Sequence, residues 1–147
     1  MRIVVLAVGK LKDRALRSVV QDYGRRIGRY ARFDEAELKD GDDAVLVERF
    51  GKAIPHGARV VALEVDGEPW SSHDLARFVG RCEGDGSVSA VAFLIGGAYG
   101  LPRGVSEAAD VRLSLSRMTL PHRLCRVVLA EQIYRAFTIL RNEPYSH

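Results

Sequence analysis

The chain has few cysteines for disulfide bonds or metal binding, and it has no apolar run long enough to span a membrane. Among its 147 residues only two are cysteines, Cys82 and Cys125, and they form neither a C-x-x-C pair nor a Cys/His spacing. This usage favours a reducing compartment and excludes a recognisable structural zinc motif. The apolar run from Ile3 to Val8 is too short for a membrane span or a secretory signal, and Gly9 follows it directly. We therefore expect a cytoplasmic protein without a membrane or metal partner, with one domain over residues 1–147.

The sequence also lacks the motifs of several enzyme classes. The segment from Gly96 to Gly100 reads Gly-Gly-Ala-Tyr-Gly, whereas a dinucleotide fingerprint would need glycine at positions 96, 98 and 101. No Gly-Lys-Ser/Thr follows it, so a P-loop is absent. No Gly-x-Ser-x-Gly elbow surrounds Ser114 or Ser116. The sequence therefore gives no support to a nucleotide-dependent oxidoreductase, an ATP-dependent enzyme or a serine hydrolase.

The charges are distributed unevenly along the chain. Residues 1–32 carry nine Lys/Arg and two Asp/Glu (+7), residues 33–86 carry six and thirteen (−7), and residues 87–147 carry seven and four (+3). If the two basic ends meet in space, they form a positive face suited to the phosphates of a nucleic acid. In the alternative interpretation, Arg25, Arg26, Arg29 and Arg32 only coat a solvated helix.

Apolar periodicity predicts an α/β fold. Runs without polar alternation, such as residues 2–8 and 59–65, are typical of strands covered on both faces. Helices are indicated by three- and four-residue apolar spacing and by the capping residues Asp13 and Ser71. We expect strands at residues 2–8, 33–38 (an edge strand), 59–65, 88–95 and 111–115, and helices at residues 13–30, 42–54, 72–82, 102–109 and 121–140. This alternation predicts a mostly parallel sheet sandwiched by helices.

Two local details follow from the same patterns. Asp66-Gly67 is expected to form a turn after the strand at residues 59–65. The helix at residues 42–54 is expected to point four apolar side chains inward: Val45, Leu46, Val47 and Phe50.

Two loops at neighbouring strand ends could frame one ligand site. Residues 96–100 offer backbone that glycine leaves accessible, although three glycines can equally form a tight corner. Residues 114–122 offer hydroxyls, a methionine sulfur and an arginine. Ligands of such sheets bind at the carboxyl ends of the strands, where both loops would lie.

Residues of the last helix and its surroundings have two interpretations each. His122, at the helix start, could accept a proton or could simply cap and pack. Glu131 lies one turn before Arg135, which fits an i,i+4 ion pair better than general-base catalysis. Three tyrosines could stack on nucleobases or could belong to the core: Tyr99, Tyr134 and Tyr145.

An ordered set of motifs along the whole chain resembles the RlmH family, small methyltransferases of the SPOUT class. The motifs are Val5–Lys12, Leu63-Glu64-Val65 with Gly67, Leu94–Gly97 with Gly100-Leu101, the loop Leu113–His122, the helical segment Arg126–Ala136 and the tail Pro144-Tyr145. The resemblance implies an α/β SPOUT fold with a deep C-terminal trefoil knot, a rare exception to unknotted topology, and a homodimer.

The resemblance also implies methylation of N3 of a pseudouridine in 23S rRNA, with S-adenosylmethionine as cofactor, on the large subunit or the assembled 70S ribosome. The implied cofactor site consists of Leu63, Gly96, Gly97, Leu115, Ser116, Arg117, Met118, Thr119 and Leu120. On this basis the expected catalytic residues are His122, Tyr134 and Arg135, and His122 and His147 are the candidate proton acceptors. The expected RNA contacts are Arg123, Arg126, Tyr145 and His147.

The chain departs from familiar members of the family at two places. Arg123 stands where some relatives have proline, and Ser146 separates Tyr145 from His147 where some relatives have a histidine directly after the tyrosine. The second departure weakens a catalytic role for His147, while the cofactor loop is intact. A competing hypothesis is a non-catalytic ribosome-binding or assembly module that keeps the fold and the basic face.

Overall fold

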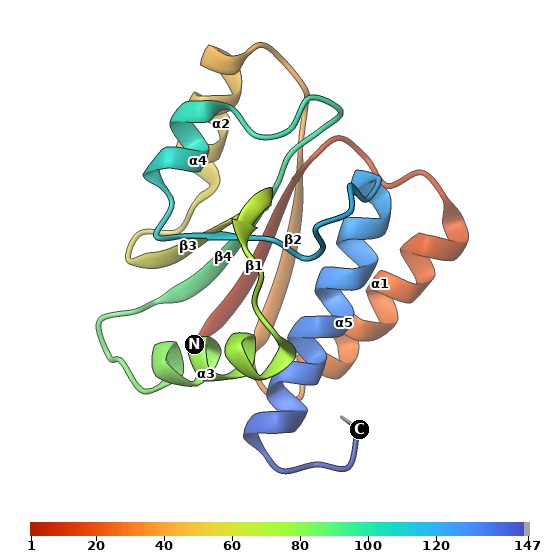
Figure 1. Ribbon diagram of the computed structural model, residues 1–147, viewed down its shortest axis with the longest axis vertical. Helices are drawn as coiled ribbons and strands as arrows, with labels where there is room; N and C mark the ends of the chain where they lie inside the picture. The colour runs from red at the N-terminus through yellow and green to blue at the C-terminus, as the bar shows by residue number, and fades with distance from the viewer. Residues whose placement is uncertain (146–147) are drawn as a thin grey trace.

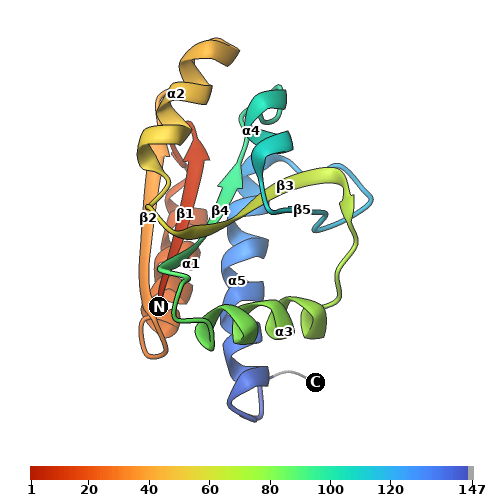
Figure 2. The same cartoon turned by 90° about the vertical axis from the view of Figure 1, so that its left-hand side faces the viewer.

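A five-stranded sheet runs through the centre of the molecule, as the computed structural model, which describes residues 1–145, shows (Figures 1 and 2). The strands are β1 (Arg2–Val8), β2 (Arg32–Leu38), β3 (Ala58–Glu68), β4 (Ala90–Ile95) and β5 (Val111–Leu113). They lie in the order β2-β1-β4-β3-β5, and every pairing between them is parallel. The predicted edge position of residues 33–38 is confirmed, because β2 pairs with β1 at one end of this order.

Helices cover both faces of the sheet. The helices α1 (Arg14–Ile27), α3 (Ser72–Glu83) and α5 (His122–Leu140) cover one face, and α2 (Asp43–Ala53) and α4 (Arg103–Ala108) cover the other (Figure 1). Successive side chains of a strand point to opposite faces. Ile3 and Val5 of β1 accordingly join the core under α1, α3 and α5, whereas Val4 and Leu6 join the core under α2 and α4. The predicted α/β sandwich around a parallel sheet is therefore confirmed.

The helix starts follow the capping signals in the sequence. The Asp13 carboxylate accepts a hydrogen bond from the Leu16 N–H at 3.0 Å, and the Asp42 carboxylate accepts one from the Val45 N–H at 2.9 Å. Ser71 forms a capping box with Asp74, in which each side chain accepts from the other residue's backbone N–H. Such caps satisfy N–H groups that a helix leaves unpaired, so they fix where α1, α2 and α3 begin.

The structure corrects the predicted turn at Asp66-Gly67. β3 continues to Glu68, and after an irregularity in register Glu68 pairs with Leu113 of β5. A Cβ atom on Gly67 would lie 2.7 Å from the Arg112 carbonyl oxygen. The glycine is therefore required by the close approach of β5 and not by a turn, which is a tertiary constraint that the local sequence does not contain.

The expected inward orientation of Val47 is also wrong. Leu46 and Phe50 are buried, but Val47 is 43% exposed. Residues 46 and 50 are one turn apart on the same face of α2, and Val47 is rotated away from that face. The short strand predicted at residues 111–115 ends at Leu113, so that Ser114 and Leu115 already belong to the following loop.

This topology brings three loops together at one edge of the sheet. β4 lies between β1 and β3, and β3 lies between β4 and β5, so the parallel strands β3, β4 and β5 end side by side. The segment after β5 then leads directly into α5 (Figure 2). Among residues 1–145, no helix has both the length and the apolar character that a membrane span would need.

Candidate functional site

A cleft of ≈ 510 Å³ lies where the expected loops meet. One wall is the loop after β4, from Ile95 to Gly100, and the opposite wall is the segment from Thr119 to His122. Leu63, Glu64 and Val65 of β3 line the cleft between the two walls, and Cys125 contributes from the first turn of α5. The cleft therefore lies at the carboxyl edge of a parallel sheet, where small ligands of α/β proteins bind.

The glycine loop has a fixed and very compact shape. Gly97 and Gly100 form an isolated antiparallel bridge, with the Gly100 N–H donating to the Gly97 carbonyl at 3.0 Å. Gly100 has a φ of +78°, which favours glycine. A Cβ atom on Gly96 would lie 2.3 Å from the Gly100 carbonyl carbon, so no other residue fits this position without moving the loop. The loop is thus both a tight corner and one wall of the cleft.

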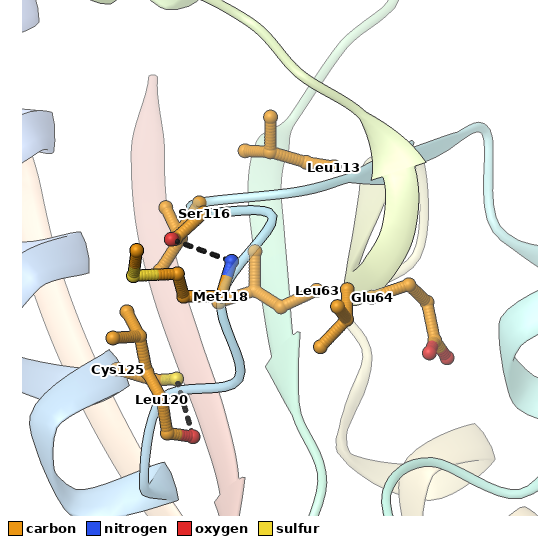
Figure 3. A pocket seen from close by; sticks show the side chains of 9 residues that line it. Leu63, Glu64, Leu113, Ser116, Met118, Leu120 and Cys125 are labelled. Carbon is orange, nitrogen blue, oxygen red and sulfur yellow. Dashed lines mark hydrogen bonds between the residues drawn. The ribbon is translucent and has the colours of Figure 1, made fainter.

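The second loop is held by its own side chains (Figure 3). The buried Ser114 hydroxyl donates to the Ser116 carbonyl at 2.9 Å, and the Ser116 hydroxyl accepts from the Met118 N–H at 3.0 Å. The Cys125 thiol donates to the Leu120 carbonyl at 3.7 Å, and burial raises the pKa of this thiol above its usual range. These bonds explain why a loop without glycine keeps one shape beside the cleft.

A smaller pocket adjoins the cleft and shares several of its lining residues. Figure 3 shows this pocket, into which Met118 and Leu120 project from the loop and Leu63 from β3. Most of the residues expected to bind a cofactor line one pocket or the other: Leu63, Gly96, Gly97, Leu115, Ser116, Met118, Thr119 and Leu120. Arg117 is the exception, because it is exposed and lines neither pocket.

Sequence reasoning missed three residues that line both pockets: Glu64, Val65 and Cys125. Glu64 and Val65 directly follow Leu63 at the end of the apolar part of β3, so their place next to Leu63 was a usable signal. Cys125 carried no such signal, since its position depends on how α5 packs against the sheet.

The composition of the cleft fits a flat ligand that is apolar in one part and polar in another. Leucine side chains from β3 and from the second loop provide apolar contacts, and the glycine loop provides accessible backbone N–H and C=O groups. The cleft volume of ≈ 510 Å³ falls in the range of about 300–1,000 Å³ that is common for ligands of cofactor size.

His122 and Arg123 begin α5 at the rim of the cleft. His122 lines the cleft, and both side chains are exposed. Their position follows from Pro121, which occupies the N-cap of the helix. The imidazole of His122 is therefore accessible to a substrate that enters the cleft from solvent.

The other expected catalytic residues lie at the opposite end of the same helix. Tyr134 is 7% exposed and packs edge-on against Tyr145, with ring centroids 4.7 Å apart. The Arg135 guanidinium donates to the Glu131 carboxylate at 2.7 Å and lies 4.9 Å from the Tyr145 ring centroid. Thirteen residues of α-helix span about 20 Å, so this cluster is remote from His122 within one chain. We call Glu131, Tyr134, Arg135 and Tyr145 the tyrosine cluster.

Tyr145 completes this cluster through its hydroxyl group. The hydroxyl donates to the Glu131 carboxylate at 2.8 Å and lies 3.4 Å from the Tyr23 hydroxyl of α1. Burial and these two contacts raise the pKa of Tyr145 well above its usual range. The expected ion pair between Glu131 and Arg135 is confirmed. His147, also expected to contact RNA, lies outside the described residues.

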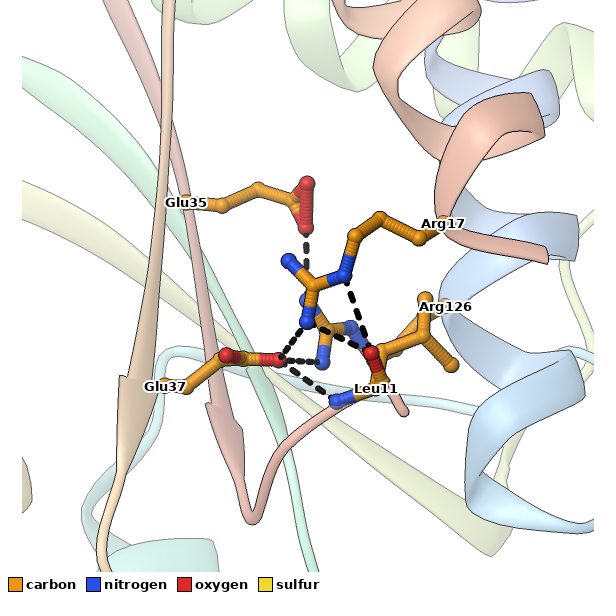
Figure 4. Close-up of polar contacts among 5 residues, drawn as sticks. All are labelled: Leu11, Arg17, Glu35, Glu37 and Arg126. Carbon is orange, nitrogen blue, oxygen red and sulfur yellow. Dashed lines mark hydrogen bonds and ion pairs between the residues drawn. The ribbon is translucent and has the colours of Figure 1, made fainter. Parts of the chain in front are cut away.

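Arg126 lies inside the protein and not on its surface (Figure 4). Its guanidinium donates to the carboxylates of Glu35, at 2.9 Å, and Glu37, both on β2. Its side chain is only 5% exposed. Arg17 and the Leu11 backbone N–H also contact Glu37, at 3.6 and 2.7 Å. The guanidinium that was expected to position RNA therefore holds α5 to β2, and it faces no open surface of the chain.

Comparison with known proteins identifies the family. The family model described as "Predicted SPOUT methyltransferase" matches residues 1–147. Relatives named ribosomal RNA large subunit methyltransferase H are similar over the full length of both chains, at 51% identity in Sorangium cellulosum and 42% in Geotalea daltonii. The relative of that name in Clostridium kluyveri is 37% identical, and 99% of each chain is covered.

A solved structure supports the fold. A probable methyltransferase from Bordetella pertussis Tohama I superposes with a TM-score of 0.56 at 12% identity, over 92% of this chain and 95% of that one. No group of three or more His, Cys, Asp or Glu side chains in the described part of the chain could hold a metal ion. The matched family, the full-length relatives and the cleft at the sheet edge agree, and the chain belongs to the SPOUT methyltransferase family.

Proposed function

We propose that this protein methylates N3 of a pseudouridine in 23S rRNA with S-adenosylmethionine, in the cytoplasm, on the large subunit or the assembled 70S ribosome. The observation that carries the proposal is the cleft between the glycine loop and the segment from Thr119 to His122, in a SPOUT chain. The relatives at 51% and 42% identity are both named ribosomal RNA large subunit methyltransferase H, which supports ribosomal RNA as the substrate.

The cofactor would be held by both loops and β3. Leu63, Leu115 and Leu120 offer apolar contacts for the purine, and the backbone at Gly96 and Gly97 allows close approach of the polar groups. When bound, S-adenosylmethionine supplies a methyl group already activated by a sulfonium. The protein therefore needs to fix the direction of approach more than to activate the donor.

The acceptor N3 must lose a proton as it gains the methyl group. Three titratable side chains line the cleft: Glu64, His122 and Cys125. His122 is the exposed one at the start of α5, and a neutral imidazole can accept a proton at a ring nitrogen. Its exposure leaves it free to meet the edge of a base that enters from solvent. We assign His122 as the proton acceptor on these grounds.

Tyr134, Arg135 and Tyr145 can serve the same reaction only if a second chain brings them near the cleft. In a two-fold dimer the same surface of both subunits meets, so antiparallel α5 helices would place the partner's tyrosine cluster beside His122. The neighbouring helices α1 and α5 expose apolar side chains that a dimer would cover, Val19 and Leu124, each 38% exposed. We therefore infer a homodimer with two composite sites.

Residues 1–147 would form one methyltransferase domain with the knotted C-terminal segment of the family. The support is the full-length family match and a sheet in which β4 is inserted between β1 and β3. This arrangement makes the last part of the chain, from β4 to α5, the part that carries both walls of the cleft.

The proposal is tested with labelled S-adenosylmethionine and ribosomes from a strain that lacks this gene. We expect one methyl group on a pseudouridine N3 of 23S rRNA, located by mass spectrometry. Calorimetry of S-adenosylmethionine binding separates this function from the alternative, a non-catalytic ribosome-binding or assembly module, which need not bind the cofactor. Ribosome binding without cofactor binding or methyl transfer would favour that module.

A further inference from the structure

Tyr99 projects entirely into solvent. Its relative exposure is 101%, and the next most exposed large apolar side chain in the described part of the chain is Met118, at 78%. An aromatic ring gains free energy when it is buried, so one that makes no internal contact is available to a partner. The fold therefore provides no explanation for the exposed ring of Tyr99, and Met118 keeps most of its surface open to solvent beside the pocket that it lines.

The two residues flank the mouth of the cleft. Tyr99 stands between Ala98 and Gly100, which line one wall, and Met118 directly precedes Thr119, which lines the other. Met118 also lines the smaller adjoining pocket. A polymer that delivers one of its units into the cleft would therefore pass these two side chains.

The loop presents Tyr99 on a fixed support. Tyr99 lies within the turn that the Gly97–Gly100 bridge closes, and the left-handed conformation of Gly100 completes this turn. A Cβ on Gly97 would lie 3.2 Å from the side chain of Val8, so the base of the loop is also packed against the end of β1. The backbone that carries Tyr99 is therefore already ordered, and a tyrosine side chain has only two χ angles to fix when it binds.

Four exposed cations lie on segments next to these loops: Lys10, Lys12, Arg117 and Arg123. Lys10 and Lys12 follow β1, whose last residue, Val8, lies against Gly97 of the glycine loop. Arg117 directly precedes Met118, and Arg123 follows His122 at the start of α5. None of the four forms an ion pair within residues 1–145. Aromatic rings interleaved with unpaired cations fit single-stranded nucleic acid, since bases stack and phosphates pair.

We propose that Tyr99 stacks on a nucleobase next to the target nucleotide in single-stranded rRNA, with Met118 against the same segment and the four cations on its phosphates. This inference rests on the proposed function and adds to it the surface that positions the RNA strand at the cleft. Every base has a flat face, so the ring would fix the position of the strand without reading its sequence.

The test compares Tyr99→Ala, Tyr99→Phe and wild type in steady-state methylation of unmethylated ribosomes. The expected result for Tyr99→Ala is a KM for ribosomes raised about 5- to 150-fold, the range that loss of one base stack produces. The kcat and the dissociation constant for S-adenosylmethionine should stay within about twofold of wild type. Tyr99→Phe, which keeps the ring, should restore the wild-type KM. Val47→Ala removes an exposed apolar side chain of α2 outside the cleft and serves as the control.

A second readout does not depend on turnover. Tyr99→Trp in a Trp70→Phe background leaves one tryptophan, whose fluorescence should be quenched by an rRNA stem-loop and by ribosomes. An unchanged KM for Tyr99→Ala together with unquenched fluorescence would overturn the inference while leaving the proposed function intact. Failure of wild type to bind S-adenosylmethionine or to transfer a methyl group would instead count against the proposed function. Quenching by RNA would still support Tyr99 as a stacking residue in that case.

Discussion

The guanidinium of Arg126 on α5 donates to the carboxylate of Glu37 on β2, although the two residues are 89 positions apart in the sequence. The same carboxylate accepts a hydrogen bond from the Leu11 N–H, and the Glu35 carboxylate accepts one from the other terminal nitrogen of Arg126. One buried arginine thus joins the last helix, the edge strand and the segment after β1. Arg126 follows Cys125, which lines the cleft, so the contacts that fix α5 on β2 also fix the part of α5 that borders the site.

Arg126→Ala should lower the free energy of unfolding by about 3 kcal/mol, because it removes a buried side chain together with its charge-assisted hydrogen bonds to Glu35 and Glu37. Urea unfolding followed by circular dichroism measures the change. Lys52→Ala is the matched control, since Lys52 pairs with Glu48 and both side chains are largely exposed, at 78% and 67%. That control should change stability by less than about 1 kcal/mol. Equal effects of the two substitutions would show that Arg126 contributes no more to the free energy of unfolding than an exposed ion pair does.

Stability should fall in mild acid through Glu37. Burial works to raise the pKa of this carboxyl, but hydrogen bonds from Arg126 and Leu11 outweigh it and hold the pKa below the ordinary value of 4.5. Ionised Glu37 therefore contributes stability that is fully present above pH 4.5 and is lost as the pH falls through the folded-state pKa. Urea midpoints measured from about pH 6 to pH 3 should show this loss in wild type and a shallower dependence in Glu37→Gln. Parallel curves for the two proteins would contradict the assignment.

The sequence predicted those parts of the fold that depend on short-range signals. Asp13 and Ser71 cap helices because their side chains meet N–H groups three residues ahead, a contact that local sequence contains. Gly67 was misjudged because its neighbour across space, Arg112, is distant in the chain. Arg126 was assigned to RNA for the same reason, since its partners belong to a strand about ninety residues earlier.

The candidate site likewise has features that short-range sequence signals predict and features that depend on tertiary contacts. The sequence predicted that the two loops form one site, because parallel strands place their carboxyl ends together. The structure places eight of the nine expected cofactor residues in adjoining pockets. The separation of His122 from Arg135 is implied by the helix expected at residues 121–140, because thirteen helical residues span about 20 Å. The place of Cys125 in the cleft is not, since it depends on how α5 packs against the sheet.

Gly96→Ala should abolish or weaken cofactor binding. The added Cβ would lie 2.3 Å from the Gly100 carbonyl carbon, so the loop must move away from the cleft. We expect S-adenosylmethionine to bind at least about tenfold more weakly by calorimetry, which requires only about 1.4 kcal/mol of distortion. Gly86→Ala is the control, because a Cβ there meets nothing within 4 Å. Unchanged affinity in Gly96→Ala would place the cofactor elsewhere.

Arg135→Ala should lower kcat for rRNA methylation by about tenfold or more while leaving the affinity for S-adenosylmethionine unchanged, since Arg135 touches neither pocket of its own chain. The control is Arg141→Ala, just beyond the same helix, where the guanidinium pairs with Glu83 at 2.9 Å. Methylation at the normal rate by Arg135→Ala would remove Arg135 from the catalytic residues.

The proposed composite site makes a stricter prediction, because the two impaired variants, Arg135→Ala and Gly96→Ala, affect different halves of it. In a mixed dimer, the Arg135→Ala chain supplies an intact cleft and the Gly96→Ala chain supplies an intact Arg135, so one of the two sites is complete. Co-expression of the two chains with different affinity tags, followed by purification on both tags, yields the mixed dimer alone. Because one of its two sites is complete, this dimer should show about half of the wild-type activity when it is assayed with ribosomes. As the control, a mixed dimer whose chains both carry Gly96→Ala should stay inactive.

If the mixed dimer of the two variants is no more active than either parent, each chain would have to complete its own site. The 20 Å along α5 would then need a rearrangement within one subunit and not a partner across the two-fold axis.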